Sequence, residues 1–191
     1  MQPLRAWLLE SVACPIDGAR LTAAGDRLTC PARHEFPIID GIPMLLATGH
    51  DPTHPYCART LDAVKGLGTP GSDAARRGNH GGVDPFVQDE IVKTNGNLYR
   101  HLRGRLPRYP IPTLRLPPGD GRTLLDVGCN WGRWTLAAGR AGYRAIGVDP
   151  WIEAARAGQR VARQLDLDVA FVVGDARHLP FADHSFDASF S

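Results

Sequence analysis

Two carboxylates and a glycine-containing loop are the residues in this sequence whose types and spacing most clearly indicate a binding site. Asp126 lies in the apolar run 123–127, which leads into the loop Gly128-Cys-Asn-Trp-Gly132. Glycines in such a loop let a ligand sit directly against the backbone. Asp149 ends a second apolar run 23 positions after Asp126, where a carboxylate accepts hydrogen bonds from both hydroxyls of a ribose. The pattern predicts a site for an adenosine-type cofactor.

The elements that must position these residues follow from apolar periodicity. Short runs of apolar and β-branched residues predict strands, and the Ala- and Arg-rich stretches between them predict crossover helices. The chain therefore reads as an α/β unit with a parallel sheet. The expected strands cover 123–127, 143–149, 169–173 and 186–190, and the expected helices cover 133–140 and 152–165.

The spacing of the loop distinguishes between cofactors. A dinucleotide site reads G-x-G-x-x-G, and with Asn130 and Gly132 at its first two glycine positions the third glycine would fall on Thr135. Asn130 holds the middle position, where Asn is the best non-glycine residue for a positive φ. A nicotinamide-dependent oxidoreductase therefore remains only as an alternative, which binding of NAD would favour.

The form D-x-G-x-N-x-G, followed by Val-Asp149-Pro150, resembles class I S-adenosylmethionine-dependent methyltransferases. Phe171-Val-Val-Gly-Asp175-Ala176 resembles the strand whose terminal Asp contacts the adenine amino group in that superfamily. The stretches 179–181 and 185–189 resemble the segment that leads into its fourth strand. The resemblance implies a doubly wound, Rossmann-like sheet and S-adenosylmethionine as cofactor.

The resemblance also implies roles for individual residues. The loop residues allow close backbone approach, Asp149 binds the ribose, and Asp175 and its neighbour contact adenine. Asp126 either orients the loop or reaches the methionine amine. Trp151 either stacks on adenine or packs under the next helix. The predicted cofactor-binding residues are Asp126, Gly128, Cys129, Asn130, Gly132, Asp149, Trp151, Asp175 and Ala176.

Methyl transfer from a sulfonium requires mainly that the acceptor be aligned with the C–S bond, and such positioning can supply about 7–11 kcal/mol of the barrier. No catalytic residue is therefore predicted. By analogy with family members that carry Ser-Phe-Asp before the fourth strand, we expect a small-molecule or lipid-like acceptor. The alternative is an adaptor that binds the cofactor and activates another methyltransferase, without turnover, through residues 4–47.

Residues 1–47 are expected to form a small α+β unit, with a helix over 4–12 and strands over 20–23 and 26–30. The run from Leu8 to Pro43 resembles the zinc-ribbon-derived family that activates tRNA and release-factor methyltransferases. A zinc ribbon needs C-x₂-C twice, and the second cysteine of each pair is replaced here. A Cys₂-His-Asp zinc set remains as an alternative to a metal-free unit with buried cysteines, which is favoured. Its members would be Cys14, Asp17, Cys30 and His34.

The expected division is a zinc-ribbon-like domain over 1–47, a flexible linker over 48–82 and the cofactor-binding domain over 83–191. Helices over 83–94 and 97–104 are expected to cover the cofactor. The sheet would have the strand order 3-2-1-4 and end with its fourth strand, as if the domain were truncated or completed by another chain.

Composition sets the remaining limits on the 191-residue chain. The net charge of +2 gives no reason to expect nucleic acid, and the Arg-containing stretch 100–108 is interrupted by proline and tyrosine. Four scattered cysteines indicate a reducing compartment, so we expect a cytoplasmic protein. No apolar run approaches the roughly 18 residues of a membrane helix, so no membrane partner is expected.

Overall fold

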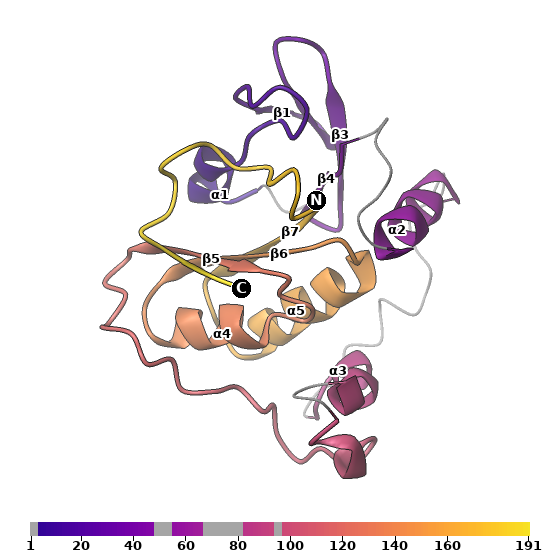
Figure 1. Ribbon diagram of the computed structural model, residues 1–191, viewed down its shortest axis with the longest axis vertical. Helices are drawn as coiled ribbons and strands as arrows, with labels where there is room; N and C mark the ends of the chain where they lie inside the picture. The colour runs from indigo at the N-terminus through magenta and orange to yellow at the C-terminus, as the bar shows by residue number, and fades with distance from the viewer. Residues whose placement is uncertain (1–3, 48–54, 67–81, 94–96) are drawn as a thin grey trace.

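The computed structural model describes residues 4–47, 55–66, 82–93 and 97–191. In these ranges, eight strands form one sheet in the order β1-β2-β3-β4-β7-β6-β5-β8. In Figure 1, α4 (Arg133–Arg140) and α5 (Ile152–Gln164) lie on one side of the parallel strands and α1 (Ala6–Ser11) lies on the other. The strands are β1 (Thr22–Ala24), β2 (Arg27–Thr29), β3 (Glu35–Ile39), β4 (Ile42–Leu45), β5 (Thr123–Val127), β6 (Arg144–Asp149), β7 (Val169–Gly174) and β8 (Ala188–Phe190).

The parallel half of the sheet has the predicted topology. Strands β7, β6, β5 and β8 are neighbours in that order, which is the expected 3-2-1-4 arrangement. All three pairings are parallel, and β8 lies at the edge of the described sheet. Every residue of β7 is buried, as expected for a strand covered on both faces.

Two helices cover one face of the parallel strands, α4 (Arg133–Arg140) and α5 (Ile152–Gln164). Their inward positions are mostly alanine and glycine, which allows close packing on the sheet. A Cβ on Gly158 of α5 would lie 2.5 Å from the Phe171 ring of β7. Both helices have nearly the predicted bounds because their amphipathic pattern is local in the sequence.

The N-terminal unit continues the same sheet. A two-residue turn joins β3 to β4, with Asp40 at φ 54° and Gly41 at φ 80°, as a type I′ hairpin turn requires. Strand β4 then pairs in parallel with β7, with Met44 opposite Val173. The strands of the expected 1–47 domain therefore belong to the same sheet as the strands of the expected cofactor-binding domain. The four residues of β4 are all buried, so this strand is stable only with cover on both faces and a paired neighbour.

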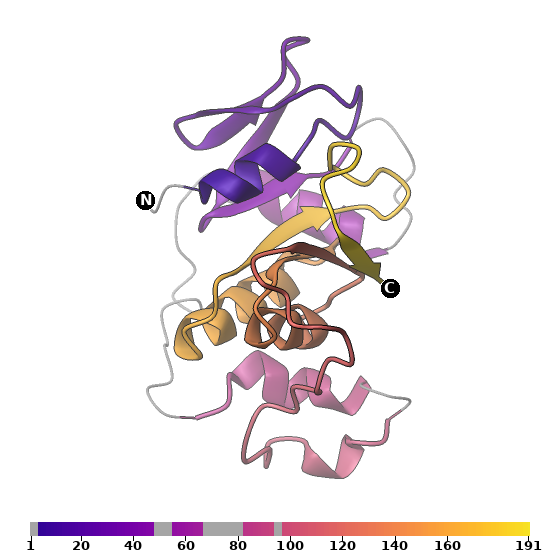
Figure 2. The same ribbon diagram turned by 90° about the vertical axis from the view of Figure 1, so that its left-hand side faces the viewer.

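Helix α1 (Ala6–Ser11) and the N-terminal hairpins cover the face of the sheet opposite α4 and α5, as the two ribbon views show (Figure 2). Leu8, Val12 and Phe36 belong to the same apolar cluster as Ile146 and Val172 of the parallel strands. The segment after α1 also pairs with a distant loop through a bridge between Val12 and Phe181. The N-terminal unit thus replaces the helices that cover the second face in doubly wound sheets.

The expected flexible linker contains a helix, α2 (Pro55–Gly66). Within it, Cys57 and Thr60 are almost fully buried. The Thr60 hydroxyl donates to the Pro150 carbonyl at 2.7 Å and accepts from the Ile152 amide at 3.2 Å. Residues 55–66 of the expected linker thus form a helix that packs on the sheet, while 48–54 and 67–81 lie outside the described residues. Because β4 runs parallel to β7, the chain leaves it at the carboxyl ends of the strands, and α2 covers that edge.

The helix expected over 83–94 is present as α3 (Pro85–Glu90) and a 3₁₀ turn, η2 (Ile91–Lys93). The second expected helix is reduced to a 3₁₀ turn, η3 (Arg100–Leu102). Arg160 of α5 holds the start of α3 by donating to both carboxylate oxygens of Asp84, at 2.7 and 3.1 Å. Helix α3 therefore lies beyond α4 and α5, on the side away from the sheet (Figure 1). Helix α2 lies at the carboxyl ends of the strands, where Thr60 bonds to Pro150 and Cys57 lies beside Asp175.

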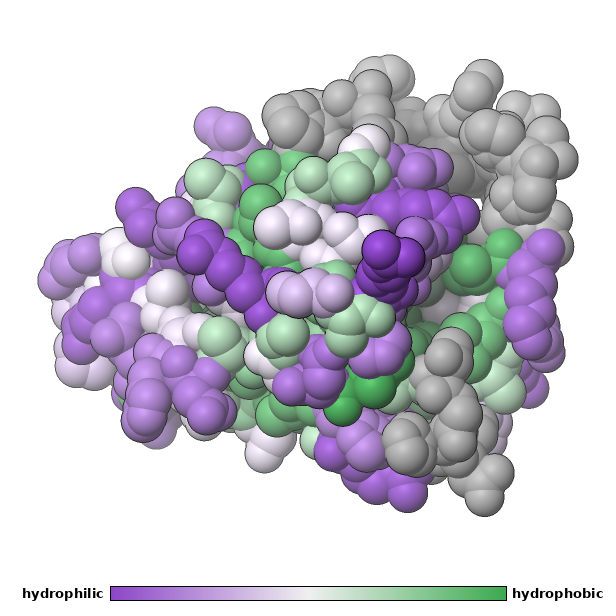
Figure 3. Space-filling model, turned by 90° about the horizontal axis from the view of Figure 1, so that it is seen from above, coloured by the Kyte–Doolittle hydropathy of each residue, from purple (hydrophilic) through white to green (hydrophobic). Residues whose placement is uncertain are grey.

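None of the helices in the described ranges combines the length and the apolar character needed to cross a bilayer. Seen from above, the molecule shows hydrophobic side chains in small groups between hydrophilic ones (Figure 3).

Candidate cofactor site

The sheet register brings the ends of three strands side by side. Val127 of β5 is opposite Val148 of β6, and Asp149 of β6 is opposite Val173 of β7. The glycine loop after β5 and the carboxylates of Asp149 and Asp175 therefore lie on one edge of the sheet. This is the edge at which doubly wound sheets bind their ligands.

Asp126 lies inside β5 rather than at its tip, and it is 2% exposed. One of its carboxylate oxygens accepts from the Thr135 amide at 2.8 Å and from the Thr135 hydroxyl at 2.6 Å. Burial raises the pKa of Asp126, and the two hydrogen bonds from Thr135 oppose that rise. Two roles were considered for Asp126. These contacts agree with the role of orienting the glycine loop, because they join Asp126 to the first turn of α4.

The loop has the expected backbone, with φ of 73° at Gly128, 51° at Asn130 and 80° at Gly132. Its two glycines serve different purposes. A Cβ on Gly128 would meet no atom within 4 Å, so open space for a ligand lies beside it. A Cβ on Gly132 would lie 2.3 Å from the Phe171 ring, so that glycine allows the loop to pack on β7.

Cys129 contributes only backbone to this edge. Its side chain is buried and points into the sheet, where a Cβ on Gly147 would lie 2.7 Å from its sulfur. Burial raises the pKa of the Cys129 thiol well above its usual range, and the carboxylates of Asp126 and Asp149 raise it further. The thiol is therefore a packing group.

Asp149 connects the loop to the next helix. Its Oδ2 accepts from the Asn130 amide at 2.8 Å, and its Oδ1 accepts from the Trp151 amide at 3.0 Å. These two contacts hold the Asp149 carboxylate at the tip of β6, next to the glycine loop. The donor set and the open space beside Gly128 fit an adenosine-type cofactor.

Trp151 packs within an aromatic group. Its ring stacks on Tyr56 of α2 with centroids 4.4 Å apart and planes 2° from parallel, and the Phe86 ring lies 4.9 Å away. The Lys93 ammonium lies 5.4 Å from the ring centroid. These contacts agree with the alternative in which Trp151 packs under neighbouring helices.

Asp175 is 7% exposed, and its Oδ1 accepts from the Arg177 amide at 2.9 Å, while Ala176 is exposed. The Cys57 thiol of α2 lies 3.9 Å from Asp175 Oδ2. Sequence reasoning missed the contribution of α2 to this edge. The signal that would have found it is the helical spacing of its inward residues after the N-terminal Pro55. These residues are Cys57, Leu61 and Val64.

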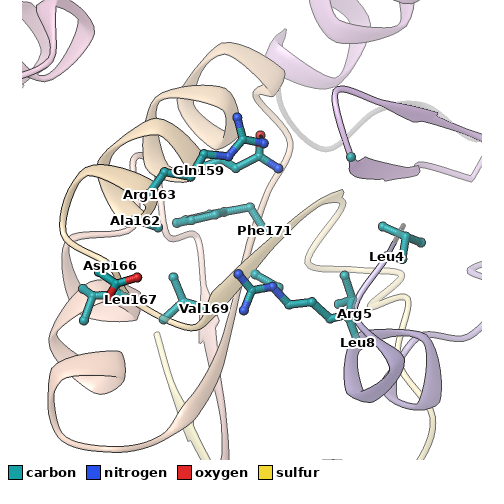
Figure 4. Close-up of a pocket in the computed structure, with 12 residues that line it drawn as sticks. Leu4, Arg5, Leu8, Gln159, Ala162, Arg163, Asp166, Leu167, Val169 and Phe171 are labelled. Atoms are coloured by element: carbon teal, nitrogen blue, oxygen red, sulfur yellow. Dashed lines mark hydrogen bonds between the residues drawn. The ribbon is translucent and has the colours of Figure 1, made fainter. Parts of the chain in front are cut away.

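A separate cavity of about 260 Å³ lies between α1, α5 and the start of β7 (Figure 4). Arg5 and Leu8 line it from the α1 side, and Arg163 lines it from α5. Because it includes Val169 at the amino end of β7, it lies at the opposite end of that strand from Asp175. It is therefore separate from the edge of the sheet that holds the glycine loop, Asp149 and Asp175, which we call the cofactor edge.

The four residues of the alternative zinc set also meet. The candidate ligand atoms of Cys14, Asp17, Cys30 and His34 all lie within 4.8 Å of one another. Both cysteines are free thiols and buried. We call these four residues the Cys–His–Asp cluster.

The fold and the loop define a Rossmann-like site for an adenosine-type cofactor, and comparison with known proteins specifies it further. Residues 124–191 match the family model described as "Methyltransferase domain". This part of the chain, which contains every predicted cofactor residue, is similar to a methyltransferase domain, and S-adenosylmethionine is the cofactor that the similarity indicates.

Two curated relatives carry related names. A probable fatty acid methyltransferase of Mycobacterium tuberculosis is 40% identical over 106 residues, which are 56% of this chain and 22% of that protein. A demethylmenaquinone methyltransferase of Roseiflexus is 44% identical over 77 residues, which are 39% of this chain and 31% of that protein. The chain thus spans less than a third of the length of these relatives.

Among solved structures, geranyl diphosphate C-methyltransferase from Streptomyces coelicolor, in complex with S-adenosyl-L-homocysteine, is 25% identical with a TM-score of 0.38. The alignment covers 73% of this chain and 56% of that one.

Proposed function

We propose that the protein is an S-adenosylmethionine-dependent methyltransferase. The observation that carries this proposal is the position of Asp149, at the tip of β6, bonded to the Asn130 amide of the glycine loop at 2.8 Å. A ribose placed beside the open face of Gly128 would meet the Asp149 carboxylate at this edge. The match of residues 124–191 to a methyltransferase domain supports the same assignment.

The cofactor supplies an electrophilic methyl group on its sulfonium. The residues of this chain bind and orient it. Asp149 accepts the ribose hydroxyls, Gly128 admits the ligand to the backbone, and Asp175 and Ala176 face the adenine. Helix α2 covers the edge and excludes water from it. Alignment of the acceptor provides the acceleration, so no general base is assigned.

We propose a small, largely apolar acceptor. The names of the two curated relatives, which refer to a fatty acid and to demethylmenaquinone, support this class. The alternative of an adaptor that captures another enzyme through residues 4–47 is less well supported, because the apolar side chains of that unit pack on the chain's own sheet.

Calorimetric titration with S-adenosylhomocysteine tests the proposal. Asp149→Ala removes two charge-assisted hydrogen bonds, each worth about 1.5–3 kcal/mol, so we expect at least a tenfold loss of affinity. The matched control is Asp183→Ala, which removes an exposed carboxylate from the loop after β7 and should bind like the parent. Equal affinity in both variants, or no binding by a folded parent chain, would contradict the proposal.

Tyr56→Ala distinguishes the two roles of Trp151. Removing Tyr56 frees the ring face on which it stacks at 4.4 Å. If Trp151 receives adenine, affinity for S-adenosylhomocysteine should be retained or rise in Tyr56→Ala and fall in Trp151→Ala. If Trp151 only packs, both variants should lose thermal stability, and both should bind S-adenosylhomocysteine with the affinity of the parent chain.

A further inference from the structure

The Cys–His–Asp cluster joins two short turns of the N-terminal unit. Cys14 and Asp17 lie in the turn that follows α1, and Cys30 and His34 lie in the turn between β2 and β3. Both cysteine sulfurs lie 3.4 Å from His34 Nδ1. Asp17 Oδ2 lies 3.1 Å from the same nitrogen and 3.4 Å from the Cys30 sulfur.

Four of the six separations between these atoms are close to the edges of a metal-centred tetrahedron, and all six pairs lie within 4.8 Å. Zinc binds sulfur at about 2.3 Å and nitrogen or oxygen at about 2.0 Å, which places neighbouring ligands about 3.3–3.8 Å apart. The four contacts fall close to that range, at 3.1–3.4 Å. The donors are two thiols, one imidazole and one carboxylate, all of which zinc accepts.

Hydrogen bonding alone does not account for the arrangement. Three groups converge on the single atom Nδ1 of His34, and an imidazole nitrogen offers either one hydrogen or one lone pair. A thiol is also a weak donor and a weak acceptor. A cation at the centre would satisfy all four groups at once.

The backbone prepares the ligands. The Ala19 amide donates to Asp17 Oδ1 at 2.9 Å, which leaves Oδ2 directed at the cluster. The turn after Cys14 closes with the Gly18 amide donating to the Cys14 carbonyl at 2.8 Å. The turn after Cys30 closes through the Arg33 amide at 2.9 Å. Such outer contacts orient metal ligands and hold them in place.

We propose that Cys14, Asp17, Cys30 and His34 bind one Zn²⁺ in a closed tetrahedral site, with the Asp17 carboxylate as the fourth ligand. The resemblance to a zinc ribbon implied a metal but not this donor set, and the sequence alone favoured a metal-free unit. The convergence of the four ligand atoms reverses that preference.

The site also connects to the cofactor edge. Next to Cys14, the Ala13 amide donates to the Pro180 carbonyl at 2.9 Å, and the Ala182 amide donates to the Ser11 carbonyl at 2.9 Å. Residues 180–182 belong to the loop that follows Asp175 and Ala176. We therefore include in the proposal that the bound ion, by fixing Cys14, restrains this loop.

Metal analysis of the intact chain provides the first test. Protein purified with zinc and then dialysed should retain about one equivalent by mass spectrometry, as four ligands for one ion require. Replacement by Co²⁺ should give the intense visible bands of tetrahedral cobalt and a near-ultraviolet thiolate charge-transfer band. A folded parent chain without stoichiometric metal or these bands would overturn the proposal.

Matched variants separate this site from other zinc binding. Asp17→Asn and Cys30→Ser should each lower zinc affinity at least tenfold, measured by competition with a chromophoric chelator. Asp17→Cys keeps four ligands and should retain the ion, so it remains informative even if the other variants fold poorly. Cys57→Ser removes a buried thiol outside the cluster and should leave zinc affinity unchanged. Equal affinity in Asp17→Asn and the parent would exclude Asp17 as a ligand.

Hydrogen exchange tests the connection to the loop. Zinc should slow exchange of the Ala13 and Ala182 amides in the parent chain, while Cys30→Ser should show no zinc-dependent change. Unchanged exchange at Ala182 in the zinc-loaded parent would contradict the restraint of the loop.

Discussion

Two regions of this protein place carboxylates, cysteines and tight turns together, but they satisfy their polar groups in different ways. At the cofactor edge, the oxygens of Asp149 accept from the Asn130 and Trp151 amides, and Cys129 turns into the core. In the Cys–His–Asp cluster, side-chain ligands face one another at 3.1–3.4 Å.

The difference indicates what each region is built to hold. At the cofactor edge, backbone amides orient the Asp149 carboxylate, and open space for an organic ligand lies beside Gly128. In the proposed zinc site, four side-chain atoms lie within 4.8 Å of one another, close enough to bind one ion. Similar residue types therefore serve different chemistry, according to whether the backbone or other side chains surround them.

Zinc loading should produce the largest difference between the two regions. If the ion binds only the folded chain, free zinc at 1,000 times its dissociation constant should add about 4 kcal/mol to the free energy of unfolding. Urea denaturation with zinc and with chelator measures this change. The free energy of unfolding of Cys30→Ser should not depend on zinc. Equal stability of the parent chain with zinc and with chelator would contradict zinc binding by the Cys–His–Asp cluster.

Gly132→Ala should have the next largest effect. The new Cβ would lie 2.3 Å from the Phe171 ring at a φ of 80°. Overpacking and the unfavourable backbone together should cost about 2–4 kcal/mol. Gly128→Ala is the matched control, because its Cβ would meet nothing within 4 Å, and it should cost about 1 kcal/mol. Chemical denaturation of both variants measures the difference, and equal losses would show that the loop does not depend on close packing.

Thr135→Val should destabilise the chain by about 1–3 kcal/mol, because it removes the hydroxyl that donates to buried Asp126 at 2.6 Å. Thr135→Ser keeps the donor and should lose less. Thr135→Val should also raise the pKa of Asp126 further, because the lost Thr135 hydroxyl opposes the effect of burial. Denaturation at neutral pH measures the stability, and indistinguishable Val and Ser variants would contradict the role of this hydrogen bond.

The smallest effect concerns Asp187, another carboxylate that accepts from a backbone amide. The Thr123 amide and hydroxyl donate to its Oδ2 at 2.7 and 2.9 Å, and they lower its pKa below the ordinary value of 3.8. Ionised Asp187 therefore stabilises the fold above pH 3.8, and this contribution is lost as the pH falls through the lowered pKa. Asp187→Asn should lower the urea midpoint at pH 7, and its difference from the parent should narrow at pH 3. A difference that is independent of pH would contradict the assignment.

Local features of the fold were predictable from the sequence. The strands β5, β6 and β7 and the helices α4 and α5 lie within a few residues of their expected bounds. The positive φ of Asn130 also follows from its place between two glycines. In each of these cases the cause is local, because periodicity and backbone preference act over a few neighbouring residues.

Longer-range features were not predictable in the same way. The pairing of Met44 with Val173 joins residues far apart in the chain, and the apolar pattern of β4 shows that it is buried but not which strand it joins. Helix α2 was missed because the glycines and prolines around it conceal a short amphipathic segment. Its contacts with Trp151 and Asp175 depend on where β4 ends.

By itself, the sequence determined the glycine loop, the order of the parallel strands and the carboxylates at their ends, because each follows from local patterns or from a recognised motif. Only the tertiary structure decided that the N-terminal unit shares the sheet, that α2 covers the cofactor edge and that four ligand atoms converge within 4.8 Å. The physical reason is that strand pairing and side-chain convergence depend on the packing of distant segments. That packing is selected by the burial of the whole apolar surface.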